Sequence, residues 1–307
     1  MKIPHTSPDI YNIHMAKTAI TALNPIMATS HARSISLPSR SNPKILQIQE
    51  LLFRLKPVEI VSLSMSEMSN KLGGVRDLLE IFNELLLLSQ TQQALLRGCN
   101  EKWADDLLDG LVLLLDVCGI AKDVFLQSKE HIRGLRSMFR RRKADEFDLT
   151  KEISHYLASR KKSNKLIHKV SKDLNTKRSC STSYSKAGND NTMATADMSR
   201  QIQHVVLTTL KSLLLYITGF KTQTKVGRWS LVSNLIRSKH VDRNEFEKVD
   251  DALNVLLDHK AEKHSNQNLQ TELGKLELSF EDVEQQLERL HRDLIKTRVT
   301  LLNILSH

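Results

Sequence analysis

The sequence predicts an all-α protein, an elongated bundle of long antiparallel helices with a disordered N-terminal tail. Apolar residues recur at alternating steps of four and three over long stretches, which is typical of helices that pack against other helices. Strict alternation of apolar and polar residues, the pattern of half-buried strands, is hard to find. The 307 residues include only ten Gly and six Pro, so residues that form turns are scarce.

The first 41 residues predict the disordered tail. They hold four of the six prolines, many Ser and Thr, and no helical stripe. Residues 42–307 are expected to form a single helical-bundle domain. Its first helix should begin at Asn42-Pro43, because Asn suits the N-cap and Pro the first helical position. That helix should end before Pro57, which disfavours helical geometry in the residue that precedes it.

Two long helices are expected next. Residues 58–97 form the first, with a kink or break at Gly73-Gly74, because each glycine costs about 1 kcal/mol relative to alanine. Residues 103–143 form the second, which should be the central helix of the bundle and end in four consecutive cations. Asp116 lies between apolar runs in this helix. We therefore expect Asp116 to be buried and paired with a Lys or Arg from a facing helix.

The second half of the chain continues the helical pattern. Residues 147–174 predict a weaker helix rich in Lys and Arg, and the polar residues 176–197 predict a flexible loop. A helix is expected over residues 198–220. Within it, residues 202–220 are roughly long enough to span a membrane, but Lys211 at their centre favours a buried bundle helix. Helical segments follow from residue 228 and over 246–257. The last long helix, residues 269–305, carries a surplus of acids that a basic neighbour would match.

The net charge of +10 is concentrated in one segment. Residues 131–180 hold 15 Lys and Arg against 5 Asp and Glu. Such a segment could be a solvated helix face or face acidic parts of the same chain, or it could contact an anionic membrane, act as a nuclear-import signal or bind nucleic acid. Aromatic residues for base stacking are scarce nearby, which makes nucleic acid the weakest of these readings. The candidate basic surface consists of Arg140, Arg141, Arg142, Lys143, Arg160, Lys161, Lys162, Lys165 and Lys169.

The tail contains a candidate phosphorylation-dependent binding site. Arg33, Ser34, Ser36 and Pro38 form an R-S-x-S-x-P pattern. Phosphorylated Ser36 would carry close to two negative charges in an extended segment, the form that 14-3-3 proteins bind. The alternative is that the tail docks on the bundle through its apolar residues.

No motif points to catalysis. The sequence has no Gly-rich nucleotide loop, nucleophile elbow or triad signature, so we expect a non-enzymatic protein with no catalytic residue and no cofactor. We expect no metal site either, because His259 and His264 are five residues apart, whereas zinc-binding helices use a spacing of four.

Cysteine usage bears on the compartment. Cys99, Cys118 and Cys180 form no paired pattern, which indicates a reducing, intracellular compartment. The cytoplasm is expected first, and the nucleus and the membrane periphery are alternatives. The basic first 41 residues leave a plastid or mitochondrial location open.

Several motifs, in this order, resemble a known family. They are HARSISLPSR at 31–40, TQQAL at 91–95, LLDGLVLLLDVCGIAKDVFLQSKEHIRGLRSMFRRR at 107–142, WSLVSNLI at 229–236 and LIKTRVTLLNILS at 294–306. From residue 27 onward the chain resembles a plant-specific family of proteins of unknown function that is grouped with BYPASS-type proteins. Family members begin shortly before the first motif, so we expect residues 1–26 to be an extension outside the family.

The resemblance implies an all-helical fold, no enzymatic activity, no catalytic residues to carry over and a part in root and shoot development. Our leading hypothesis is therefore a non-enzymatic plant protein that acts through protein–protein contacts. The alternative is a peripheral membrane protein that uses the basic segment 131–178. Nucleic-acid binding is the third hypothesis.

Overall fold

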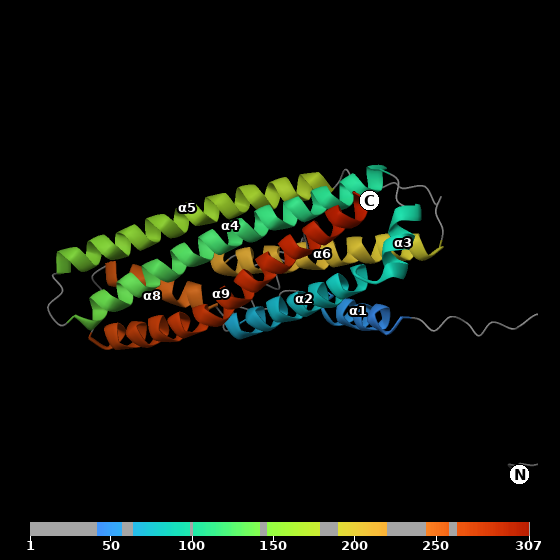
Figure 1. Ribbon diagram of the computed structural model, residues 1–307. Coiled ribbons are helices and arrows are strands. Elements are labelled where there is room, and N and C mark those ends of the chain that lie inside the picture. Colours follow the sequence, from blue (N-terminus) through green and yellow to red (C-terminus); the bar gives the residue numbers. More distant parts are fainter. Residues whose placement is uncertain are drawn as a thin grey trace, which may run out of the picture. The chain divides into compact units, whose positions relative to one another are not determined.

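The computed structural model describes residues 42–56, 64–98, 101–141, 146–178, 190–219, 244–257 and 263–306 (Figure 1). Within these residues the chain forms eight helices and no strand, as predicted. All eight belong to one compact unit, Ser41–His307. The predicted tail, including the proposed extension 1–26, lies outside the described residues.

The first two helices begin with side-chain caps. In α1 (Pro43–Arg54), the side chain of Asn42 accepts a hydrogen bond from the amide of Lys44 at 3.0 Å, which confirms the predicted N-cap. In α2 (Met65–Leu86), Ser64 and Glu67 cap each other's backbone amides reciprocally. Both arrangements satisfy amides that have no partner within the helix.

The helix predicted over 58–97 is two helices. α2 ends at Leu86 and α3 (Ser89–Gly98) begins after a turn, and residues 57–63 lie outside the described part. Of the kink or break expected at Gly73-Gly74, the break is absent, because α2 runs through both glycines. A Cβ atom at Gly74 would lie 2.9 Å from the side chain of Leu55. The missing side chain therefore lets the end of α1 pack closely against α2.

The central pair consists of α4 (Glu101–Arg140) and α9 (Lys263–Leu305), with 40 and 43 residues. Each is about 60 Å long at 1.5 Å per residue. They run antiparallel and share a buried seam, in which the rings of Phe125 and Phe280 meet edge to face at 4.9 Å. The predicted seam of α4 is buried from Leu107 to Leu135. Asp116 is exposed, so the prediction that it is buried and paired is wrong.

The remaining helices, α5 (Glu146–Arg178), α6 (Asp190–Thr218) and α8 (Glu245–Leu257), complete the bundle. The helices α4, α5 and α6 alternate in direction, whereas α2 and α9 run parallel, with Gly73 near Gln286 and Arg76 near Asp293 (Figure 1). α6 begins at Asp190, so the predicted loop 176–197 is helical at both ends. Residues 179–189 and the segment predicted from residue 228 lie outside the described part.

α6 is a core helix of the bundle, as predicted. The side chains of Ile202, Val206, Leu210, Leu213 and Ile217 are at most 2% exposed. It packs against α4, α2, α3 and α5. None of the helices in the described part is both long enough and apolar enough to span a membrane.

The end of α6 and the start of α8 are joined by side chains. Gly219 follows α6 with a φ of 75°, the left-handed conformation that commonly ends helices. The side-chain amide of Asn244 donates to the carbonyl of Tyr216 at 2.7 Å. The Tyr216 hydroxyl donates to Glu245, whose carboxylate also accepts the amide of Met65 at the start of α2. Three helix ends are therefore held at one place.

Candidate functional site on the outer face of helix α5

Helix α5 has a buried face and an exposed face. On the buried face, residues at steps of three and four point into the bundle, where α5 packs against α4, α6 and α8. They are Ile153, Tyr156, Arg160, Ser163, Ile167 and Leu174. On the exposed face are Lys161, Lys162, Lys165 and Lys169, which we call the lysine face.

Arg160 was predicted to belong to the basic surface, and this prediction is wrong. Its side chain is 6% exposed. Its guanidinium donates to the carboxylate of Asp250 on α8 and to the carbonyl of Ile217 in the last turn of α6. It also lies over the ring of Phe246, with Cζ 5.0 Å from the ring centroid. Arg160 therefore holds three helices together and is unavailable to a partner.

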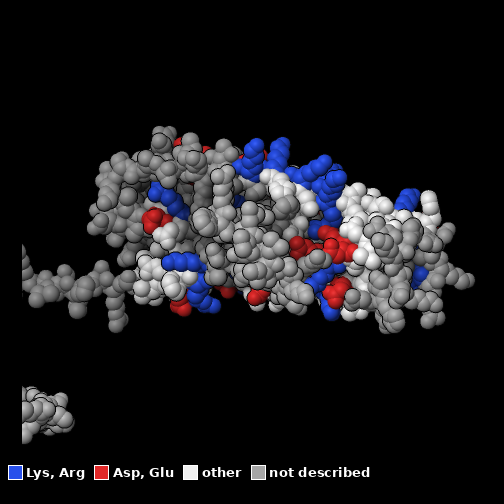
Figure 2. Space-filling model, turned by 180° about the vertical axis from the view of Figure 1, so that it is seen from behind, with Lys and Arg blue, Asp and Glu red and all other residues white. Residues whose placement is uncertain are grey.

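The lysine face has few acidic neighbours along its own helix. Residues 153–172 contain no Asp or Glu, and the nearest acid in the sequence is Asp173, four residues after Lys169. In the described part of the chain, no acid lies within ion-pair distance of Lys161, Lys162, Lys165 or Lys169. Figure 2 shows Lys and Arg side chains gathered along the upper edge of this side of the molecule, where Figure 1 places α5. Leu166, 44% exposed, lies among these lysines.

The cations of α4 differ from those of the lysine face, because acidic side chains of α9 lie opposite them and form ion pairs with them. The acid surplus of the last helix was expected to match a basic neighbour, and the second half of α4 is such a neighbour. The residue numbers of the cations rise along α4 while the residue numbers of their acidic partners fall along α9, as expected for two antiparallel helices. The pairs are Lys122 with Glu288, Lys129 with Glu284, and Arg133 and Arg136 with Glu277. We call this set the α4–α9 ladder.

The other predicted site residues lie apart from the ladder. Arg140 and Arg141 are exposed at the end of α4, while Arg142 and Lys143 lie outside the described residues. So does the phosphorylation motif formed by Arg33, Ser34, Ser36 and Pro38.

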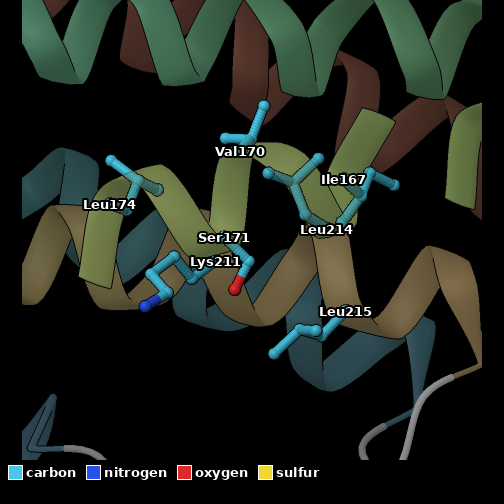
Figure 3. Close-up of a pocket in the computed structure, with 7 residues that line it drawn as sticks. All are labelled: Ile167, Val170, Ser171, Leu174, Lys211, Leu214 and Leu215. Carbon is cyan, nitrogen blue, oxygen red and sulfur yellow. The ribbon is translucent and has the colours of Figure 1, made fainter. Parts of the chain in front are cut away.

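Two hollows next to these helices have different characters. Between α5 and α6, a narrow crevice is lined mainly by apolar side chains, among them Ile167, Leu174 and Leu214, and it has no space for a water molecule (Figure 3). Between α8 and α9, a hollow of about 540 Å³ is lined by charges of both signs, including Lys248, Asp251 and Glu272. The first is a packing feature of the core, and the second is open to solvent.

Among the residues that the structure describes, one group of side chains could hold a metal ion, which the sequence had not led us to expect. His131 on α4 faces Glu152 and His155 on α5, and one ligand atom from each lies within 4.8 Å of the others. The group was missed in the sequence because histidines were compared only along single helices. The available signal was the E-x-x-H pattern at 152–155, which places a carboxylate and an imidazole on one helix face.

These features define an all-helical bundle protein with one set of cations paired along α4 and α9 and another set exposed on α5. Within that class, the chain belongs to the BPS1 family, because the family model described as Protein BPS1 matches residues 71–304. This confirms the BYPASS-type plant family indicated by the motifs. Membership supports a role in plant development. No curated protein and no solved structure matches the chain.

Proposed function

We propose that this chain is a non-enzymatic member of its family that acts in root and shoot development by binding an acidic protein partner through the lysine face of α5. The supporting observation is the contrast between the two sets of cations. The ladder cations of α4 have acids opposite them, whereas the lysine face presents ammonium groups to solvent. Complementary charge on a partner would steer association and fix the orientation of the complex.

The arrangement of α5 favours a protein over a lipid surface. The apolar stripe of α5, including Ile153, Tyr156 and Ile167, is already packed in the bundle. The helix therefore cannot turn an apolar face into a lipid interface, as interfacial helices do. The exposed face of α5 carries four lysines around the half-exposed Leu166. This composition suits a small protein–protein interface with a polar rim.

The expected strength of this contact is modest. Exposed ion pairs contribute about 0.2–1 kcal/mol each, so four lysines contribute roughly 1–4 kcal/mol. The interaction should weaken as ionic strength rises, because salt screens exposed charges over about 8–10 Å. A contact of this kind suits a regulated, reversible association.

The test compares two charge-reversal variants of the full chain. One changes Lys161, Lys162, Lys165 and Lys169 to Glu, and the control changes the exposed Arg54, Lys56, Lys248 and Lys296 to Glu. Proteins captured from plant extract are identified and then titrated in purified form. We expect a partner with an acidic surface that binds the wild type and the control but binds the α5 variant at least about tenfold more weakly. Equal weakening by both variants would mean that only net charge matters, and the proposal would fail.

An anionic membrane is the second candidate, because clustered lysines are each attracted by about 1 kcal/mol to an anionic lipid surface. Co-sedimentation with phosphatidylserine vesicles, run with the same two variants, separates the candidates. If the α5 variant loses vesicle binding but keeps the protein partner, the lysine face is a membrane contact. Live-cell imaging of the two variants then tests the proposed cytoplasmic location against membrane and nuclear ones.

The 14-3-3 contact through phosphorylated Ser36 is an independent proposal, because it does not use α5. Ser36→Ala should abolish capture of 14-3-3 proteins while leaving the α5-dependent partner bound. Unchanged 14-3-3 capture would contradict this proposal alone.

A further inference from the structure

The side of α5 that faces α4 brings together two imidazoles and a carboxylate. Glu152 and His155 are three residues apart on α5, and His131 reaches them from α4. The two imidazole rings meet at 74° with their centroids 5.1 Å apart. His131 and Glu152 are half-buried and His155 is exposed, so solvent, and an ion dissolved in it, can reach the group.

The ligand set and its spacing suit a borderline transition-metal ion. Two histidines with one glutamate are a recurrent set of three protein ligands for Zn²⁺, with metal–ligand distances of about 2.0–2.2 Å. Two ligand atoms on a tetrahedral ion therefore lie about 3.3 Å apart. The three atoms here are within 4.8 Å of one another. Rotation of the side chains about their χ angles can close a gap of at most about 1.5 Å without moving either helix.

The local structure keeps the carboxylate close to α4. Gly134 lies one helical turn beyond His131, and a Cβ atom there would be only 3.2 Å from Oε1 of Glu152. A glycine inside a long helix costs about 1 kcal/mol relative to alanine. At this position it gives the Glu152 carboxylate the room to approach the backbone of α4 beside His131.

We propose that His131, Glu152 and His155 form a binding site for Zn²⁺ or a similar divalent transition-metal ion, which fastens α5 to α4. Three protein ligands leave a fourth position for water. The site lies at the N-terminal half of α5, whereas the lysine face lies at its middle. Metal binding therefore does not depend on the proposed partner contact.

The test uses the full chain, stripped with a chelator and titrated with Zn²⁺ by calorimetry. Co²⁺ serves as the spectroscopic probe, because nitrogen and oxygen ligands give visible bands without the charge-transfer band of a thiolate. We expect one ion per chain, with a Zn²⁺-dependent rise in melting temperature and no comparable effect of Mg²⁺. His155→Ala and Glu152→Gln should each weaken binding by more than about tenfold.

His168→Ala, an exposed histidine on the same helix, is the matched control and should bind as the wild type does. Because His155 is exposed, its replacement should leave the fold intact, which circular dichroism checks. Absence of binding would overturn the proposal. So would a thiolate band with Co²⁺, or equal affinity of the wild type and the His155→Ala variant, because the ion would then sit elsewhere.

Discussion

Arg160 of α5 donates to Oδ2 of Asp250 on α8 through Nη2 at 2.8 Å and through Nε at 3.1 Å, across 90 residues of sequence. The same carboxylate accepts the hydroxyl of Tyr156 at 2.6 Å. The other guanidinium nitrogen donates to the Ile217 carbonyl at the end of α6. Because each polar group in this network has a partner, the charge is tolerated inside the bundle.

Replacing Arg160 should therefore destabilise the fold strongly. Arg160→Met removes the cation beside a half-buried carboxylate, which keeps only the hydroxyl of Tyr156, and leaves the carbonyl of Ile217 without its side-chain donor. We expect a loss of about 3 kcal/mol in the free energy of unfolding. Urea denaturation followed by circular dichroism measures it. Lys161→Met, at the adjacent exposed position, is the control and should change stability by less than about 0.5 kcal/mol. Similar losses for both variants would contradict the role given to Arg160.

The α4–α9 ladder predicts a specific response to acid. Burial acts to raise the pKa of Glu277, but the hydrogen bonds and charges of Arg136 and Arg133 outweigh it and hold the pKa below its ordinary value of 4.5. A carboxyl with a lowered pKa in the folded state stabilises the fold above its unfolded pKa, and this contribution is lost as pH falls through the folded value. Stability should thus decrease as the pH drops below about 4.5.

Glu277→Gln should remove that part of the pH dependence. The variant should be less stable than the wild type at neutral pH, by about 1–2 kcal/mol, and the difference should shrink as pH is lowered to about 3. Free energies of unfolding across this range measure both effects. Glu281→Gln, at an exposed position of the same helix, should show neither. A constant difference at all pH values would show that Glu277 acts through packing and not through its charge.

Two glycines should respond oppositely to alanine. Gly119 lies within α4, and a Cβ atom there would meet no neighbouring atom of the described residues within 4 Å, so Gly119→Ala should stabilise by up to about 1 kcal/mol. Gly219 has a φ of 75°, and a Cβ atom there would lie 2.7 Å from Glu247. Gly219→Ala should therefore destabilise by about 1–2 kcal/mol. Thermal melting of the two variants beside the wild type tests the pair, and shifts of the same sign would contradict it.

Cys118 should resist alkylation in the folded protein. Burial raises the pKa of its thiol to about 12, although Lys122 acts in the opposite direction, and the reactive species is the thiolate. Iodoacetamide at neutral pH should leave Cys118 unmodified until the chain is unfolded in urea, as peptide mapping by mass spectrometry would show. Modification of Cys118 at the same rate with and without urea would place it at the surface.

Periodicity predicted the fold better than local composition predicted individual side chains. Asp116 was expected to be buried because its neighbours are apolar, yet it lies seven residues from the exposed Asp109 and Asp123 and shares their face of α4. Arg160 was expected at the surface because Lys161 and Lys162 follow it. Its position four residues after Tyr156 places it on the buried stripe.

The burial of Asp116 and the exposure of Arg160 were both predicted wrongly because burial depends on contacts with residues that are distant in the sequence. A charge can occupy the buried stripe of α5 only because Asp250 lies opposite it, and no local pattern reveals that pairing. The same holds for His131, whose partners lie on another helix. The long apolar seams, by contrast, contain enough information to predict α4 and α9, since burial of a continuous stripe requires a partner helix along its whole length.

The side chains that join the end of α6 to the start of α8 also bear on which substitutions the bundle can tolerate. The hydrogen bond from Asn244 to the carbonyl of Tyr216 fixes the start of α8 at the end of α6. The Tyr216 hydroxyl donates to Glu245, whose carboxylate also accepts the amide of Met65. A substitution of Glu245 would therefore loosen the start of α2 as well as the contact between α6 and α8.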